Sequence, residues 1–268
     1  MRSNMQIGAF IPVRLGSERL PRKHLQLIQG RPVLQHLLDR VFASKYIDAT
    51  NVIVCTTCES EDDQLQAIVE KSGARLFRGE RDDIIKRFYD ALQKYPLDII
   101  AEIDGDDPCI DTLYLDRCIE EIMKDVSLDI VLPVGLPTGV ASKVFTKHAL
   151  QHVYQIYGTT KNDTGFMWYF TKTGICKVLE ISPESIDHID DNIRLTLDYP
   201  EDLKFFRELF ARLYQPGKIF NVRDIVALCK SEPALIKINA GVQKKFVERT
   251  QQLAKLAFKR DGLIYTVE

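Results

Sequence analysis

Two charged stretches of the sequence contain the residue types that phosphate chemistry requires. The first runs from residue 11 to residue 30 and carries four cations within ten residues, at Arg14, Arg19, Arg22 and Lys23. It follows a short apolar stretch and precedes a helical pattern, so its cations and free N–H groups fall at the carboxyl end of a strand, where α/β sheets bind ligands. Charged loops are usually only solvated, but this one is long for a strand-to-helix connection. The stretch therefore predicts a site for a polyanionic ligand.

The second stretch is acidic and spans residues 102–108. Asp104, Asp106 and Asp107 stand within four residues, after a buried strand. Loop aspartates often form turns or cap helices, and Asp111 fits that role. Three neighbouring carboxylates repel one another and are best tolerated around a cation, for which Mg²⁺ with bound substrate phosphates is the usual choice. A basic loop and an acidic loop at one sheet edge indicate phosphoryl or nucleotidyl transfer.

The overall composition limits the classes of function that need be considered. The chain has 268 residues, enough for one large domain or one and a half smaller ones, and its net charge of −2 gives no general basic field for nucleic acid. No apolar run is long enough to span a bilayer and the N-terminus lacks a signal-peptide core, so we expect a cytoplasmic protein. The six cysteines are scattered, with one CxxC at Cys55 and Cys58, and we expect reduced thiols.

The first half alternates strand and helix patterns. Strands are expected at 7–11, 52–55, 74–77, 97–103 and 129–134, and helices at 34–42, 61–71, 82–92 and 113–123. This βαβαβαβαβ order is typical of a mostly parallel sheet covered by helices on both faces. Right-handed crossovers then bring the loops after the strands to one edge. We expect the loops at 12–24, 56–62, 78–84 and 104–111 to converge on one site.

The second half has a less regular rhythm. Helices are expected at 148–157, 201–213, 222–229 and 243–258, and strands at the aromatic run 166–170 and at 193–197. The last helix is charged and amphipathic, and its pattern leaves open whether it packs on the body or on a second subunit. His148 and His152 share a helix face without a zinc-protease glutamate, so we interpret them as surface or interface residues.

Five motifs in order carry a family resemblance. They lie at 11–32, at 54–57 with 61–63, at 77–80 running to 85–89, at 104–108, and at 194–203. Together they resemble the sugar-acid cytidylyltransferases, which include the CMP-Kdo and CMP-acylneuraminate synthetases, and most closely the spore-coat polysaccharide biosynthesis protein F group. The likeness covers most of residues 6–135 and resumes at about 190–210.

The resemblance implies a three-layer α/β/α nucleotide-diphospho-sugar transferase fold, Rossmann-like, with a mixed and mostly parallel central sheet. It implies one cytidylyltransferase domain over 1–240, with a nucleotide-binding half (about 1–135), an acceptor and dimerisation part (136–192) and a return to the core (193–240); a C-terminal helical extension at 241–268 would follow. The implied reaction transfers CMP from CTP to a sugar acid of the 3-deoxy-ulosonic or sialic-acid type, with Mg²⁺ as cofactor and release of pyrophosphate, for surface polysaccharide synthesis. The implied assembly is a homodimer.

Site residues follow from the matched motifs. Those expected to be catalytic are Arg14, Lys23, Asp106 and Asp198, the two aspartates as metal ligands. By pattern alone Asp198 would instead be a helix cap before Pro200. The residues expected at the nucleotide are Pro12, Val13, Arg14, Gly16, Ser17, Arg19, Lys23, Thr56 and Asp106, and those expected at the acceptor are Arg87, Lys143, Lys161 and Asn162.

Three departures from the family pattern leave the acceptor open. Arg22 stands where the first motif usually has glycine, Lys143 stands where the closest relatives usually have glutamate, and residues 160–170 replace a histidine-containing stretch. One alternative is an enzyme of the same fold that uses another nucleoside triphosphate and a sugar phosphate. A second alternative is a non-catalytic nucleotide-sugar-binding module, which predicts loss of a metal ligand or phosphate cation. No feature supports a membrane or nucleic-acid partner.

Overall fold

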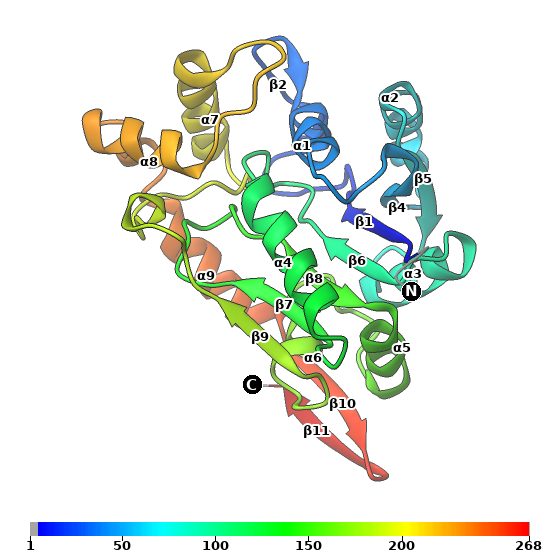
Figure 1. The fold of residues 1–268 in the computed structure, drawn as a ribbon. Coiled ribbons are helices and arrows are strands. Elements are labelled where there is room, and N and C mark those ends of the chain that lie inside the picture. Colours follow the sequence, from blue (N-terminus) through cyan, green and yellow to red (C-terminus); the bar gives the residue numbers. More distant parts are fainter. Residues whose placement is uncertain (1–4, 268) are drawn as a thin grey trace.

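A seven-stranded sheet forms the centre of the computed structural model, which describes residues 5–267 (Figure 1). Its strand order is β5–β4–β1–β6–β8–β7–β9; β8 runs antiparallel to its two neighbours, and every other adjacent pair is parallel. The predicted mixed, mostly parallel sheet is therefore confirmed. The strands are β1 (Ile7–Pro12), β4 (Val52–Thr57), β5 (Arg75–Gly79), β6 (Ile99–Glu102), β7 (Ile130–Pro133), β8 (Lys143–Thr146) and β9 (Val178–Ile181).

Helices cover both faces because the central strands bury side chains on both sides. Along β1, Ala9 and Ile11 point into one core while Phe10 points into the other. The first core takes side chains from α1 (Val33–Phe42), α2 (Gln64–Ser72), α4 (Thr112–Lys124), α7 (Pro200–Leu213) and α8 (Val222–Ser231). The second takes them from α3 (Ile84–Lys94), α5 (Lys147–Ile156) and α6 (Trp168–Thr171). Three layers result.

Short elements complete the described part of the chain. Two small antiparallel pairs are β2 (Leu27–Ile28) with β3 (Arg31–Pro32), and β10 (Leu256–Arg260) with β11 (Leu263–Val267). Single 3-10 turns occupy Lys23–Leu25, Ala49–Asn51, Ser60–Asp63, Ile186–His188 and Ile236–Ile238. Within residues 5–267, none of the helices has the length and apolar character that crossing a bilayer would need.

The predicted elements of the first half are all present, with bounds shifted by a few residues. In the second half two predictions are wrong. Residues 166–170 form a helical turn because Phe166, Tyr169 and Phe170 are buried at helical spacing, with less buried residues between them. Residues 193–197 are buried but lie outside the sheet, and their single β-bridge joins Arg194 to Thr138, which is itself outside the named strands.

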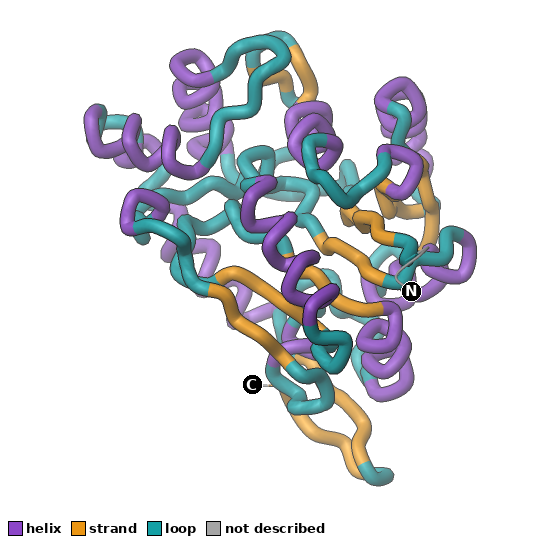
Figure 2. The backbone as a smooth tube through the Cα atoms, in the orientation of Figure 1, coloured by secondary structure: helices purple, strands orange, loops and turns teal. Residues whose placement is uncertain are grey.

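The C-terminal helical extension is also corrected. Helix α9 (Val242–Leu253) ends before Leu256, and the remainder forms the β10–β11 hairpin, which projects from the body (Figure 2). Asp261 and Gly262 both have positive φ, 51° and 76°, as a two-residue hairpin turn requires. An Asp-Gly pair between alternating residues is the sequence signal that identifies such a turn.

Candidate active site

The basic loop after β1 is fixed by backbone hydrogen bonds to its surroundings. Val13 N donates to Cys55 O at 3.1 Å, and Arg22 N donates back to Leu15 O at 3.2 Å. Leu15 N donates to Asp62 Oδ1 at 2.8 Å. The loop is therefore shaped before any ligand arrives, and its Lys23 contacts Asp106 of the acidic loop.

Asp62 supports the basic loop from below. Its buried carboxylate accepts hydrogen bonds from Leu15 N and from the hydroxyls of Thr56 and Thr57. Burial alone would raise the pKa of Asp62, but the hydrogen bonds from Thr57, Leu15 and Thr56 outweigh it and lower that pKa. Thr56 is fully buried against this carboxylate, so the prediction that it lines the nucleotide site is wrong. The loop at 56–62 thus supports the site without lining it.

The acidic loop after β6 packs directly on the basic loop. A Cβ at Gly105 would lie 2.6 Å from Pro12 O, so only glycine allows this approach. His24 Nδ1 lies 2.9 Å from Gly105 O. Burial first, and then the Lys23 charge, lower the pKa of His24 to about 4, so the ring is neutral and donates its Nδ1–H to that carbonyl. Two motifs about 90 residues apart in sequence are thereby joined.

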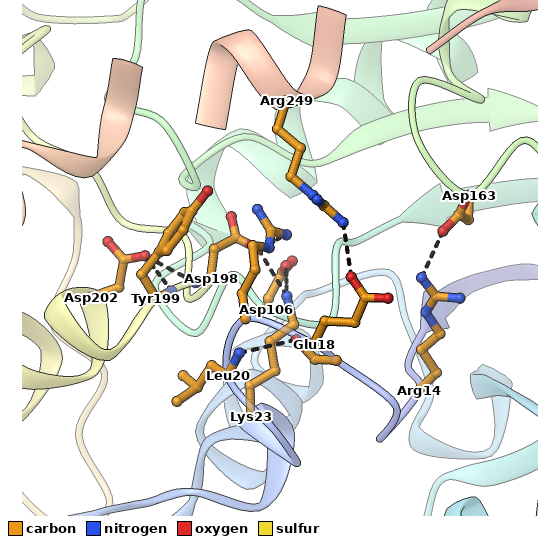
Figure 3. A network of polar contacts seen from close by, with 12 residues as sticks. Arg14, Glu18, Leu20, Lys23, Asp106, Asp163, Asp198, Tyr199, Asp202 and Arg249 are labelled. Atoms are coloured by element: carbon orange, nitrogen blue, oxygen red, sulfur yellow. Dashed lines mark hydrogen bonds and ion pairs between the residues drawn. The ribbon is translucent and has the colours of Figure 1, made fainter. Parts of the chain in front are cut away.

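A buried ion network forms where the two loops meet (Figure 3). Lys23 Nζ contacts both Asp106 Oδ2 and Asp198 Oδ1, the latter at 3.1 Å. Asp198 also accepts from Arg19 at 2.6 Å and from Arg194 at 2.8 Å. The carboxylate of Asp198 is therefore held by three cations, with 2% of its side chain exposed.

Asp198 is free of the capping role that its position suggested. Tyr199 occupies the N-cap of α7, and Asp202 accepts from the backbone N–H groups of Asp198 and Tyr199, each at 3.0 Å. Leu197 N donates to Asp106 O at 2.8 Å, which ties this segment to the acidic loop. The two predicted metal ligands are brought together by these contacts.

The two carboxylates suit a divalent cation. Residues 5–267 contain no group of three or more His, Cys, Asp or Glu side chains with metal-site geometry. Asp106 and Asp198 nevertheless both contact one ammonium, that of Lys23, which shows that a cation can lie between them. Two carboxylates with waters and ligand phosphates are the usual set for Mg²⁺, so the donors present fit that ion.

Two adjoining cavities open around this network. The large chamber, about 800 Å³, is lined by eight of the nine residues expected at the nucleotide, Thr56 being the exception. The small chamber, about 360 Å³, lies beside it and is lined by Lys143, Phe166, Trp168 and Phe246 among others. The side chains of Arg19, Asp104 and Asp106 border both chambers. Volumes of this size suit one larger and one smaller ligand with a shared contact zone.

A family model described as cytidylyltransferase matches residues 9–221, a range that contains the whole ion network. The chain belongs to the cytidylyltransferase family. An uncharacterised protein of Methanocaldococcus jannaschii is 29% identical over 254 residues, covering 92% of this chain and all of that one. The spore coat polysaccharide biosynthesis protein SpsF of Bacillus subtilis is 33% identical over 113 residues, 41% of this chain and 47% of SpsF.

Further cytidylyltransferases are similar to the chain in sequence and in structure. A 3-deoxy-manno-octulosonate cytidylyltransferase of Hydrogenovibrio crunogenus is 34% identical over 111 residues, 40% of this chain and 42% of that enzyme. A cytidylyltransferase from Leptospira borgpetersenii has a solved structure that superposes with a TM-score of 0.78 at 28% identity, covering 87% of this chain and 97% of that one. The expected family resemblance is therefore confirmed.

Arg14, the first cation of this cytidylyltransferase's basic loop, is paired in the large chamber. Its guanidinium donates to Asp82 Oδ1 at 3.2 Å and to Asp163 Oδ2 at 2.6 Å, and 36% of its side chain is exposed. The loops at 78–84 and 160–165 thus reach the chamber through their aspartates. These pairs hold the Arg14 fork in the cavity with its remaining surface accessible.

The residues expected at the acceptor divide into two groups. Lys143 lines the small chamber and pairs with Asp104, and Lys161 lines the large one. Asn162 is fully buried; its Oδ1 accepts from Ile84 N at 2.8 Å and its amide donates to Asp83, so it caps helix α3 instead of contacting a ligand. The expectation for Asn162 is wrong, because its amide oxygen and nitrogen already have hydrogen-bond partners within the protein and are not available to a ligand.

Arg87 requires a similar correction. It borders the large chamber, yet it is only 2% exposed. Its guanidinium donates to the carbonyl oxygens of Glu80, Arg81 and Cys55 at 2.6, 2.5 and 3.4 Å. Arg87 therefore stabilises the loop at 79–83. Its guanidinium is engaged by backbone carbonyls, so the expected contact with the acceptor is not supported.

The floor of the small chamber is formed by Asp107 and Lys143, with the buried Glu102 in contact with Lys143. Glu102 Oε2 lies 3.2 Å from Lys143 Nζ, but neither oxygen of Glu102 accepts a hydrogen bond, nor does Asp107 Oδ1. Burial first, and then the charge of Asp104, raise the pKa of Glu102 to about 8. Burial and Asp106 raise the pKa of Asp107 well above its usual range. The floor is polar and incompletely paired.

Helix α9 forms the opposite wall of the small chamber. Phe246, Arg249 and Leu253 line it, and Arg249 lines the large chamber as well. The sequence indicated only an amphipathic helix at this position, because nothing local to residues 242–253 says which surface their apolar face covers. In the structure that face closes the site.

Proposed function

We propose that the chain transfers CMP from CTP to a sugar acid and releases pyrophosphate, with Mg²⁺ as cofactor. The observation that carries the proposal is the convergence of Asp106 and Asp198 on the Lys23 ammonium, beside a chamber lined by Arg14 and Arg19. A dense set of cations next to two oxygen ligands is suited to a triphosphate and its metal. Each of the four expected catalytic side chains lines at least one of the two chambers, which argues against a binding module without activity.

The reaction requires little covalent participation by the protein. An acceptor hydroxyl oxygen forms a bond to the α-phosphorus, the bond from that phosphorus to the bridging oxygen of the β-phosphate breaks, pyrophosphate leaves, and the hydroxyl proton passes to solvent. Positioning and charge neutralisation supply most of the rate in such a transfer. Lys23 and Arg14 would neutralise the leaving pyrophosphate, and the rigid loop from Pro12 to Ser17 would hold the nucleotide.

Mg²⁺ would be held by Asp106 and Asp198. When bound it supplies positive charge at the phosphates and a template for the reacting groups. Lys23 already neutralises both carboxylates, so it would move from them toward the phosphates when the ion takes its place. That exchange suits the long, unbranched lysine side chain, a compact charge on a flexible stem.

The small chamber would take the acceptor. Lys143 on its floor offers a cation for an acidic group, and Trp168 and Phe246 offer apolar faces for a sugar ring. A related enzyme acts on 3-deoxy-manno-octulosonate by its name, which favours a sugar acid over a sugar phosphate. The homodimer, the cytoplasmic location and the part in surface polysaccharide synthesis stay predictions.

The test is pyrophosphate release with Mg²⁺ across CTP, UTP, GTP, ATP and dTTP, each paired with a panel of sugar acids and sugar phosphates. The Asp106→Ala protein is the blank. We expect release with CTP and one sugar acid, and none from the blank. Release with another triphosphate but not CTP would overturn the choice of base, and release with sugar phosphates alone would overturn the acceptor class.

A further inference from the structure

Helix α9 is attached to the ion network at one end. Arg194, which binds Asp198, also donates to Gln243 Oε1 at 2.7 Å, and its guanidinium carbon lies 4.5 Å from the centre of the Phe246 ring. The start of α9 is therefore fixed relative to the expected metal ligand. The helix then runs across the site, so that Arg249, one turn after Phe246, lies over the boundary between the two chambers.

Arg249 has a position that few cations share. Among the described residues, Arg19 and Arg249 are the two cations that line both chambers. Arg19 is committed to the buried Asp198 at 2.6 Å. Arg249 has a far weaker partner, Glu18 on the basic loop, at 3.4 Å, with 42% and 85% of the two side chains exposed. Figure 3 shows the guanidinium extending from α9 toward that loop.

The Glu18 contact does not account for Arg249 as a structural residue. An ion pair this long and this exposed contributes little to stability, because water screens both charges. The same weakness makes the pair easy to exchange for another anion. Glu18 belongs to the loop that would frame the triphosphate, so its carboxylate lies where ligand anions would arrive.

We infer that Arg249 is a catalytic residue, which leaves Glu18 on substrate binding and contacts the phosphates of the nucleotide where the acceptor meets them. The inference rests on the proposed function, in which two anionic substrates react at the boundary of the chambers. Their mutual repulsion must be offset there, and a guanidinium can donate to two oxygens at once. The carboxyl-terminal quarter of the chain would thus contribute to transfer as well as to closing the cavity.

The experiment compares five purified full-length variants with the wild type: Arg249→Ala, Arg249→Lys, Glu18→Gln, Lys245→Ala and the double variant of Glu18→Gln with Arg249→Ala. Lys245 is exposed on the same helix and lines neither chamber, so its loss controls for a general loss of positive charge. Two quantities are measured, the Kd of CTP without acceptor and the kcat of pyrophosphate release with the best acceptor. Thermal unfolding of each variant checks that the fold is kept.

For Arg249→Ala we expect CTP to bind about tenfold more weakly and kcat to fall about a hundredfold, the size of loss typical for one transition-state donor. Arg249→Lys should recover only part of kcat, because an ammonium lacks the fork. Glu18→Gln should tighten CTP binding in the presence of Arg249 and by less in the Arg249→Ala background. Lys245→Ala should match the wild type. An Arg249→Ala protein within twofold of the wild type in both quantities would overturn the inference.

Failure of the proposed function is distinguishable from failure of this inference. If the wild type releases no pyrophosphate with any pair of substrates, the proposed function fails, and the inference is then judged by binding alone, with whichever of the five triphosphates binds most tightly. A tenfold weaker Kd in Arg249→Ala, absent in Lys245→Ala, supports it. A Kd within twofold, or no triphosphate binding at all, overturns it.

Discussion

The two chambers contain buried carboxylates in opposite situations. In the ion network, whose Lys23 and Asp106 line the large chamber, Asp198 accepts from three cations and is almost fully shielded from solvent. On the floor of the small chamber, Glu102 and Asp107 are also buried but have oxygens without a hydrogen bond. The four buried side-chain polar atoms without a partner that were found in residues 5–267 belong to Glu102, Asp107 and Ser142. Asp107 lines the small chamber, Glu102 contacts the Lys143 ammonium that lines it, and Ser142 precedes Lys143 in the chain.

The two groups of carboxylates therefore differ in how far their polar contacts are already made before a ligand binds. A saturated ion network fixes charges in place before the reaction, so that little reorganisation is required when phosphates bind. Unpaired buried polar groups cost stability, and native proteins keep them mainly where function requires them. The large chamber is thus ready for its ligand, whereas the floor of the small one would gain hydrogen bonds when an acceptor or water reaches Asp107.

Removal of the saturated carboxylate should have the largest effect. Asp198→Ala removes a carboxylate that the buried Arg194 and Lys23 share and leaves them only Asp202 and Asp106, so we expect a loss of about 3–5 kcal/mol in the free energy of unfolding. Asp106→Ala should lose far less stability because its side chain is 22% exposed and has Lys23 as its cation. Both variants should lose about two to three decades of kcat. Urea unfolding and pyrophosphate release measure the two quantities.

Asp90→Ala is the control for this pair, since it removes an exposed carboxylate that pairs with Lys86 on α3. It should change stability by about 0.5 kcal/mol or less and leave the rate unchanged. Equal losses of stability in the Asp198 and Asp106 variants would contradict the view that Asp198 is the centre of the network.

The unpaired carboxyl of Glu102 should make the free energy of unfolding depend on pH. The pKa of Glu102 is about 8 in the folded chain and near 4.5 when unfolded, so between these values the folded state holds a proton that the unfolded state has lost. The contribution of Glu102 to the free energy of unfolding is therefore most favourable below pH 4.5. It declines as the pH rises to 8, by up to about 1.4 kcal/mol per pH unit.

The comparison with Glu102→Gln isolates this group in the window from pH 7 to 8, where the ring of His24, with a pKa of about 4 in the folded chain and 6.5 when unfolded, is mostly neutral in both states. Glu102→Gln should flatten the decline and make the variant more stable than the wild type at pH 8. The charged groups that face Glu102 are Lys143, at 3.2 Å, and Asp104, which pairs with the same ammonium. Parallel stability curves for variant and wild type, from urea unfolding at several pH values, would show that Glu102 does not titrate in this range.

The smallest expected effect concerns Arg22 in the basic loop. Arg22 adopts the left-handed conformation, φ 55° and ψ 35°, which favours glycine, and its side chain extends to Gln64 without lining either chamber. Arg22→Gly should raise the free energy of unfolding by about 0.5 kcal/mol, since relief of about 1–2 kcal/mol of backbone strain exceeds the added freedom of the unfolded chain.

Arg22→Ala is the matched control, because alanine keeps the strain and loses the Gln64 contact. It should be slightly less stable than the wild type, and neither variant should alter kcat. A drop in activity for Arg22→Gly would mean that the strained backbone positions Lys23, which follows it directly.

The first half of the fold was predictable because each buried face there follows a regular period. The positions of Arg14, Lys23 and Asp106 were predictable because parallel strands end at one edge. Thr56 and Asn162 were misplaced because motif matching does not reveal whether a side chain faces the cavity or the core, and it does not reveal that the guanidinium of Arg87, which borders the large chamber, is engaged by backbone carbonyls. Arg249 was missed because its role depends on where α9 packs, and no local pattern in residues 242–253 carries that information. Asp261 and Gly262 did carry a hairpin signal that the amphipathic pattern concealed.

The bond from Leu197 N to Asp106 O has a consequence for the order in which the site forms during synthesis. A ribosome makes the basic loop and the acidic loop well before residue 198 emerges, and β1 can pair with β6 at that stage. Lys23 then has Asp106 as its only carboxylate of the network. The nascent chain would hold a half-built anion site until the segment at 193–198 docks, so its cations would be exposed to cellular polyanions while residues 109–198 are translated.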